Sequence, residues 1–202
     1  MNIGKTLILI SLVPLLLSGC AAVVIGGAAA GATATVAHDR RTTGVFIEDG
    51  AIEQKAGKGF SADAEIKDNS HINVTSYNTV VLITGEAPSE DIRNRIVNIV
   101  REIPKVTHVY NEVTIAAPSS WTSRSSDSLI TSKVKTNLLK LDNLVATRVK
   151  VVTDKGVVYL MGILTRPEAD AATGEAQRTG GVQKVVKLFQ YIDEDAPENQ
   201  GA

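Results

Sequence analysis

The sequence predicts an α+β protein with two tandem αββαβ domains, each a three-stranded mixed sheet with two helices on one face. Two observations predict this fold. First, the segments 72–85 and 149–162 share one pattern: an alternating strand, a polar turn, a second strand and a glycine. Second, helical spacing of apolar residues precedes and follows each segment, and a further strand closes each unit.

The two predicted hairpins are similar. Asn78-Thr79 and Lys155-Gly156 stand between the paired strands, where a tight hairpin turn needs residues that tolerate positive φ. Both second strands end on a glycine within V-x-L-x-G or a close variant.

The flanking segments favour helices with one apolar side. Upstream of the hairpins, 49–60 aligns with 127–138, and the helix of the second unit is expected to extend over 127–141. Downstream, 89–102 carries an isoleucine and valine stripe, whereas 167–179 carries a leaner alanine stripe. The uncovered sheet faces are expected to be wetter. Because each copy is close to the lower size limit for folding alone, contact between the copies would help.

Strands over 106–115 and 182–192 close the two units. Between the units, 117–126 is rich in Ser and polar, as a linker would be. The predicted organisation is a signal peptide at 1–19, a flexible tether at 20–48, a first domain at 49–116, the linker at 117–126, a second domain at 127–192 and a disordered acidic tail at 193–202.

The first twenty residues predict export and lipidation. Lys5 precedes an apolar run over 7–17, which is too short to span about 30 Å of hydrocarbon. The sequence Leu-Ser-Gly before Cys20 resembles a bacterial lipobox, so we expect cleavage before Cys20 and attachment of a diacylglycerol and an acyl chain to it. The absence of aspartate at position 21 favours the outer membrane, with the protein facing the periplasm.

The segment 21–37 is small and apolar, and it leaves two interpretations open. One is a glycine-interrupted transmembrane helix, and the other is a tether near the membrane surface. Three glycines weaken a helix here by about 1 kcal/mol each relative to alanine, and the lipid already supplies an anchor. We favour the tether.

Composition argues against an enzyme, a metal protein and a nucleic-acid binder. The net charge is −1, and the three histidines stand apart from one another. Ser132 and Lys135 fit S-x-x-K, but the S-D-N and K-T-G motifs that accompany it in penicillin-binding proteins are absent. We therefore predict no catalytic residue and no cofactor apart from the lipid on Cys20.

Charge is unevenly divided between the units. The stretch 49–115 has seven Lys/Arg and ten Asp/Glu, a net charge of −3, and 127–192 has ten and six, a net charge of +4. Divergence in sign is expected if only the second unit faces an anionic surface. In its first helix, lysines stand beside apolar residues, which suits a lipid headgroup boundary. The predicted lipid-binding residues are Trp121, Leu129, Ile130, Lys133, Val134, Thr136, Asn137, Leu139 and Lys140.

The repeated pattern resembles the BON domain, and two copies behind a lipobox are similar to the dual-BON outer-membrane lipoproteins. Val80 to Gly85 and Val157 to Gly162 carry the resemblance, which covers about 48 to 192. It implies binding of anionic phospholipids such as phosphatidylglycerol, a role in outer-membrane integrity, enrichment at the division septum and envelope or divisome partners. It also implies an aromatic residue near the start of the lipid-binding helix. Here Leu129 occupies that position, and Trp121 lies eight residues earlier.

Two further interpretations stay open. Leu129 could instead pack on the first unit, which would leave Trp121 as a linker residue. The protein could also be an interaction scaffold of the cell envelope, docking through its sheet faces or through Leu129 and Leu139.

Overall fold

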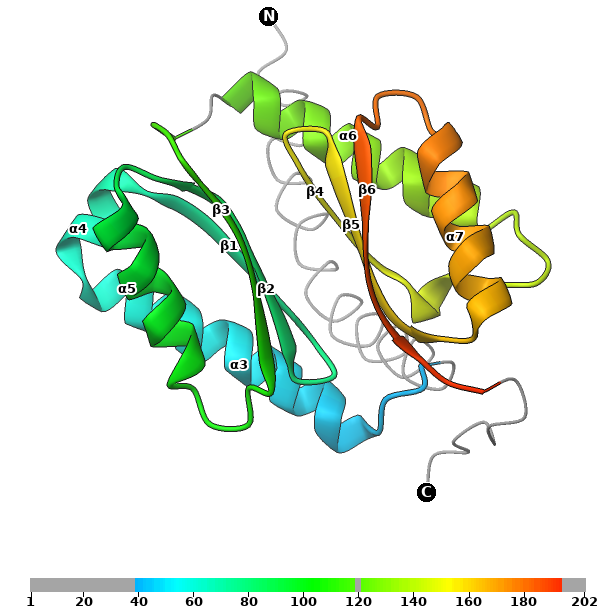
Figure 1. Ribbon diagram of the computed structural model, residues 1–202, viewed down its shortest axis with the longest axis horizontal. Coiled ribbons are helices and arrows are strands. Elements are labelled where there is room, and N and C mark those ends of the chain that lie inside the picture. The colour runs from blue at the N-terminus through cyan, green and yellow to red at the C-terminus, as the bar shows by residue number, and fades with distance from the viewer. Residues whose placement is uncertain (1–38, 119–120, 194–202) are drawn as a thin grey trace, which may run out of the picture. The chain divides into compact units, whose positions relative to one another are not determined.

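The computed structural model describes residues 39–118 and 121–193, and these fall within one compact unit, His38–Ala202. The predicted signal peptide, Cys20 and nearly all of the tail lie outside the described residues. Within them, the predicted α+β fold is confirmed: two αββαβ repeats follow one another along the chain, each with a three-stranded sheet (Figure 1).

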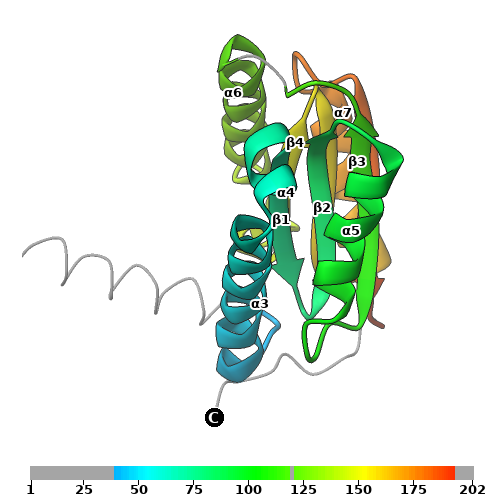
Figure 2. The same ribbon diagram turned by 90° about the vertical axis from the view of Figure 1, so that its left-hand side faces the viewer.

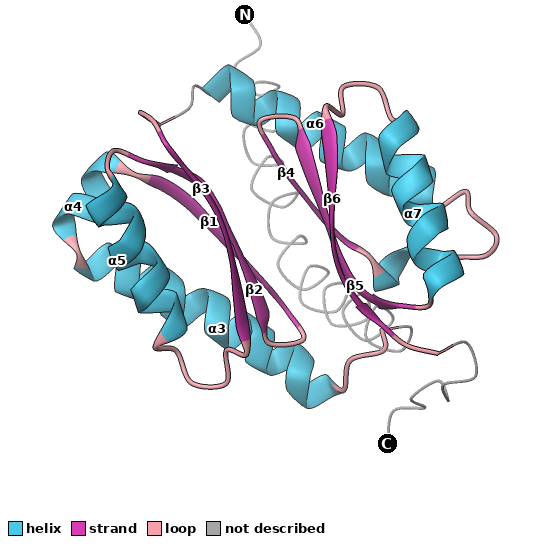
Figure 3. Ribbon diagram, viewed as in Figure 1, coloured by secondary structure: helices cyan, strands magenta, loops and turns pink. Residues whose placement is uncertain are grey.

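The first repeat contains α3 (Thr43–Ala62), a short α4 (Ala64–Asn69), β1 (His71–Tyr77), β2 (Val80–Ala87), α5 (Glu90–Arg101) and β3 (His108–Ile115). Strand β2 lies in the centre, antiparallel to β1 and parallel to β3 (Figure 3). Helix α4, which the sequence pattern did not indicate, begins because the Asp63 side chain accepts hydrogen bonds from two backbone N–H groups of its first turn.

The second repeat contains α6 (Trp121–Leu138), the 3₁₀ turn η1 (Ala146–Arg148), β4 (Lys150–Asp154), β5 (Val157–Leu164), α7 (Arg166–Arg178) and β6 (Lys184–Tyr191). Its sheet repeats the topology, with β5 antiparallel to β4 and parallel to β6. A capping box of Thr165 and Glu168 starts α7.

Two helices begin earlier than the sequence indicates. Helix α3 starts at Thr43, within the stretch predicted as a tether, because Thr42 caps it. Helix α6 starts at Trp121, so the second half of the predicted linker 117–126 is helical. The serines there favour a loop by propensity, but Arg124 of this turn contacts His71 of the first repeat. Tertiary contact therefore outweighs local preference.

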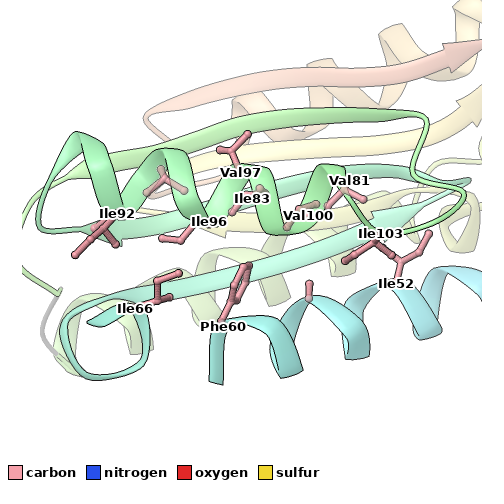
Figure 4. Close-up of a cluster of buried hydrophobic side chains, with 13 residues drawn as sticks. Ile52, Phe60, Ile66, Val81, Ile83, Ile92, Ile96, Val97, Val100 and Ile103 are labelled. Carbon is pink, nitrogen blue, oxygen red and sulfur yellow. The ribbon is translucent and has the colours of Figure 1, made fainter. Parts of the chain in front are cut away.

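Each repeat has its own apolar core between its helices and one face of its sheet. In the first, α5 places Ile92, Ile96 and Val100 against Val81 and Ile83 of β2 (Figure 4). In the second, the leaner alanine stripe of α7 contributes Ala169, Ala172 and Ala176 to the core. The predicted alanine stripe is thus the buried side of α7, and small side chains permit close packing of a helix on a sheet.

The other faces of the two sheets are not wet, contrary to the sequence-based expectation. They pack on each other through a third buried cluster, which contains Tyr77 and Leu82 from the first repeat and Tyr159, Met161 and Leu188 from the second. The central strands are therefore buried on both faces. Their continuous apolar runs, rather than alternating ones, are the sequence signal for such strands.

The segment just before α3, here called the strap (Asp39, Arg40 and Arg41), joins the repeats. Arg40 donates to the carbonyl of Ile163 (2.9 Å) and pairs with the Glu168 carboxylate of the second repeat. Arg41 pairs with Asp39 and with Asp49 of α3. These side chains are almost entirely shielded from solvent. The strap therefore fixes where the chain enters the folded unit.

Alanine substitutions at two glycines of the first repeat are expected to change the free energy of unfolding in opposite directions. Gly85 has φ +117, and a Cβ there would lie 1.9 Å from the carbonyl oxygen of His71, so Gly85→Ala is expected to lower the free energy of unfolding by about 2–3 kcal/mol. Gly50 lies in α3 with open space around it, so Gly50→Ala is expected to raise that energy by about 0.5–1 kcal/mol. Urea denaturation of both variants checks this, and equal effects would contradict it.

Candidate functional site

The side chains of α6 divide into a buried and an exposed set. Ile130 and Val134 belong to the core of the second repeat, with 8% and 0% of their surface exposed. The helix turns that stripe toward the sheet, so these two predicted residues lie in the core rather than on the exposed side of α6. Leu129 and Leu139, by contrast, are 62% and 71% exposed, and neither packs on the first repeat.

The remaining predicted residues lie on or near the exposed side. Lys133, Thr136 and Lys140 are exposed, and with Leu129 and Leu139 they are called the α6 surface below. Leu139 and Lys140 lie in the turn just after the helix, which ends at Leu138 rather than at the predicted 141. Asn137 is half-buried: its amide donates to the Thr179 hydroxyl (3.1 Å), and its oxygen accepts from the Lys140 ammonium (2.9 Å). Asn137 thus orients Lys140 while binding α6 to the end of α7. The Trp121 side chain lies outside the described structure.

The lysines of the α6 region differ in their partners from several cations of the first repeat. Within the described residues, Lys133, Lys135 and Lys140 form no ion pair with a carboxylate. In the first repeat, Lys55 and Lys105 both pair with Glu48, and further pairs join Arg93 to Glu90 and Arg95 to Asp63 and Glu65. Positive charge on α6 is therefore available to an external anion.

An open groove of about 580 Å³ runs beside the first half of α6. Leu129, Ile130 and Lys133 form one wall, and the turn between β4 and β5 and the segment 181–183 form the other. Gly156 and Gly181 have φ +75 and +102, and a Cβ at either would crowd the side chains of Gln183 and Ile130 respectively. This second wall was not predicted from the sequence, because it comes from segments far from α6 in the chain.

Asp127 fixes α6 to the hairpin turn. Its carboxylate accepts hydrogen bonds from the backbone N–H groups of Lys155 (2.9 Å) and Gly156 (2.8 Å). In the first repeat, the matching Asp49 accepts from the N–H groups of Asn78 and Thr79, each at 2.8 Å. The alignment of Asp49 with Asp127 thus reflects one shared device, in which the first helix of each repeat satisfies the N–H groups of its hairpin turn.

A match to the BON domain model covers residues 48–117 and 126–193, which together are most of the described chain. The chain belongs to the BON-domain family. It is 39% identical to outer membrane lipoprotein DolP of Haemophilus influenzae over 177 residues, which cover 88% of this chain and 91% of that relative. It is also 36% identical to a 21 kDa hemolysin of Actinobacillus pleuropneumoniae, over 76% of this chain and 79% of the relative.

The geometry around the S-x-x-K motif does not resemble a nucleophile site in this BON protein. Ser132 lies on the exposed side of α6, and its hydroxyl donates to the backbone carbonyl of Ser128 (2.9 Å). Among the described residues, no group of three or more potential ligands could hold a metal ion. The same part of the chain contains no helix with the length and apolar character needed to cross a bilayer.

Acidic groups from both repeats meet beside the hairpin turn of the second BON repeat. The Glu86 side chain is fully buried, and the Lys155 ammonium lies 2.9 Å from its carboxylate and 2.8 Å from the Thr114 hydroxyl. Burial raises the pKa of the nearby Asp154 carboxyl, the Glu86 carboxylate raises it further, and Lys155 lowers it. A negative Asp154 is therefore unfavourable in the folded protein.

The raised pKa of Asp154 predicts that Asp154→Asn stabilises the protein at neutral pH. A carboxyl whose folded pKa is raised contributes stability below its unfolded pKa, near 4, and loses it as the pH rises through the folded pKa. Asparagine carries no charge at any pH, so it avoids that loss. We expect a higher melting temperature than the wild type at pH 7 and a smaller difference at pH 4. An unchanged difference across that range would contradict the assignment.

Proposed function

We propose that this BON protein is an outer-membrane-anchored periplasmic lipoprotein that binds anionic phospholipid through helix α6 and supports outer-membrane integrity. One observation carries the proposal: the lysines of α6 have no described carboxylate partner and lie beside two largely exposed leucines. The similarity to an outer membrane lipoprotein supports the location. Enrichment at division sites is proposed on the family resemblance.

The physical basis is a combination of two weak contributions. A lysine close to an anionic bilayer contributes about 1 kcal/mol. Burying an exposed leucine side chain contributes about 1.5–3 kcal/mol more. The stems of Lys133 and Lys140 can lie along the apolar boundary while their ammonium groups reach phosphate. Leu129 and Leu139 stand at opposite ends of the α6 surface, so the helix would lie along the membrane plane rather than enter it.

Vesicle flotation tests the proposal. The unit 38–202, which keeps the strap, is mixed with vesicles of phosphatidylcholine containing or lacking phosphatidylglycerol. We expect co-flotation with the anionic vesicles at low salt, and its loss when salt shortens the Debye length to a few ångströms. Failure to float with phosphatidylglycerol vesicles at low salt, with the fold intact by circular dichroism, would contradict lipid binding by this unit.

The alternative is an envelope scaffold in which the same leucines contact a protein. Large exposed apolar side chains suit either partner. The sheet faces are not available for docking, because they pack on each other. Co-purification that survives Lys133→Glu with Lys140→Glu, but is lost in Leu129→Asp, would favour the scaffold. Loss of membrane association in the charge variant would favour lipid.

A further inference from the structure

The first turns of α3 expose apolar side chains that the function proposed for α6 does not use. Ile47 is 65% exposed and Phe46 is 39% exposed. Among the described residues of the first repeat, the other large hydrophobic residue with comparable exposure is Ile115, at the end of β3. Neighbouring apolar side chains at the start of a helix are not needed for the core below, which already contains Ile52, Ala56 and Phe60 from α3.

The strap places this apolar turn beside the point where the chain enters the folded unit. The Arg41 guanidinium lies 5.0 Å from the centre of the Phe46 ring and 3.9 Å from that of Tyr77. Its ion pairs with Asp39 and Asp49 hold it there. Arg40 is held at the same time by Glu168, so the described chain enters the folded unit at the strap, a few residues before Phe46 and Ile47.

Chain length keeps this turn close to the anchor. Nineteen residues lead from Cys20 to Asp39, and even a fully extended chain of that length spans only about 65 Å. Lipidation at Cys20 would keep the first turns of α3 within about 65 Å of the bilayer. Tethering of this kind gives an effective concentration of the order of mM, at which a weak contact is populated.

The rest of α3 suits a position in the membrane plane. At about 100° per residue, Gln54 and Lys58 lie on the same line as Ile47, and both are exposed. The Lys58 ammonium donates to Gln54 and forms no described ion pair with a carboxylate. The first turn of α3 contains no acidic residue. The line thus runs from apolar at the anchored end to cationic two to three turns later.

Both first helices lie on one side of the folded unit. Helix α3 packs along β1 and α6 along β4, whereas α5 and α7 contact β3 and β6. Figure 2 shows α3 and α6 on one side, with α5 and α7 on the other.

We propose that Phe46 and Ile47 form a second membrane contact, inserted at the lipid surface beside the anchor. This contact is independent of the site on α6 that is proposed to bind anionic lipid. Because this contact is apolar, its ligand is the acyl boundary of the bilayer rather than a particular headgroup. The inference goes beyond the function proposed for α6, since it holds for zwitterionic membranes as well.

The full lipidated chain, reconstituted into phosphatidylcholine vesicles, provides the test. Cys20 is the sole native cysteine, and in the lipidated chain its sulfur carries the diacylglyceryl group as a thioether, so Ile47→Cys introduces one reactive thiol for a polarity-sensitive fluorophore. We expect quenching by nitroxide-bearing lipids and protection from aqueous iodide. The control is Asn98→Cys on the exposed side of α5, which is expected to show the reverse. Quenching of the Ile47 probe by iodide alone would overturn the proposal, as would shielding from both quenchers, which would mean a protein segment covers the turn.

A substitution at Ile47 tests whether insertion depends on this side chain. Ile47→Glu places a negative charge near the helix start, which favours helix α3 but opposes insertion. With the fluorophore moved to Gln54→Cys, we expect lipid quenching to fall by about tenfold in the Ile47→Glu variant. Unchanged quenching would overturn the proposal.

The two membrane sites are separable by experiment. In a Lys133→Glu, Lys140→Glu background, the Ile47 probe is expected to stay quenched by lipid, because its contact does not rest on those lysines. Loss of that quenching would show that α6 alone holds the unit at the surface, and it would overturn an independent contact at α3. Failure of the α6 variants to alter phosphatidylglycerol binding would instead contradict the function proposed for α6.

Discussion

Replacing Glu168 by alanine is expected to lower the free energy of unfolding by about 3–5 kcal/mol. Glu168 accepts from Arg40 at 2.5 and 3.2 Å and from Arg148 at 3.2 Å, and all three side chains are largely buried. It also closes the capping box of α7 with Thr165. The substitution would leave two guanidinium groups without this carboxylate and would remove one hydrogen-bond partner from the helix cap.

Urea denaturation at pH 7 measures the effect. Glu175→Ala is the matched control, because Glu175 lies on the same helix and its described ion pair is with the exposed Arg178, a contact worth no more than about 1 kcal/mol. A double-mutant cycle with Arg40→Ala isolates the coupling across the repeats. Similar losses for Glu168→Ala and Glu175→Ala would contradict a clamp between the repeats.

Acidification should reproduce part of that loss. Burial alone would raise the pKa of Glu168, but hydrogen bonds from Arg40 and Thr165 outweigh it and the pKa is lowered. A carboxyl of lowered pKa contributes stability above its unfolded value, near 4.3, and this contribution is lost as the pH falls through the folded pKa. The stability difference between the wild type and Glu168→Gln should therefore shrink below pH 4. A difference independent of pH would contradict this account.

The contacts of the strap could not be predicted from the sequence. Hydrophobic period and turn residues predicted both hairpins and all four long helices, because these depend on neighbours along the chain. Arg40 pairs with a residue 128 positions away, and no local pattern encodes such a pair. Arg40 and Arg41 therefore fall within the predicted flexible tether 20–48, although they hold the two repeats and α3 in place.

The burial of both sheet faces was indicated by the continuous apolar runs of the central strands, although wetter outer faces were expected. Strand β5 contains Val158, Tyr159, Leu160 and Met161 in succession, all buried, and a strand that is wet on one face would alternate. Stability argues the same way, since each repeat alone is close to the size at which a core becomes marginal. The repeats share a buried interface and fold as one unit.

On α6, the sequence predicted the exposed lysines and leucines but also assigned the core stripe to the ligand. Helical spacing identifies which residues share a side, and it separates Ile130 and Val134 from Leu129 and Lys133. It does not reveal what lies across the groove. Gln183 approaches α6 only because β6 is parallel to β5 and the segment before it passes the hairpin turn. That wall could be found only from the fold.

Reversing two charges on the α6 surface should abolish binding to anionic membranes. In Lys133→Glu with Lys140→Glu, each change removes an attraction of about 1 kcal/mol and adds a repulsion of similar size, so affinity for phosphatidylglycerol vesicles should fall on the order of 10³-fold at low salt. Both side chains are exposed and lack a described carboxylate partner, so the fold should be unaffected.

The control has the same net charge. Lys184→Glu with Lys187→Glu alters two exposed lysines on β6, in the same repeat but outside the α6 surface, and should weaken binding by much less. Vesicle co-sedimentation at two salt concentrations measures both variants. Equal losses would mean that net charge alone attracts the protein and that α6 has no special part in it. A loss confined to the α6 variant, and smaller at high salt, is what direct contact between these lysines and lipid phosphate requires.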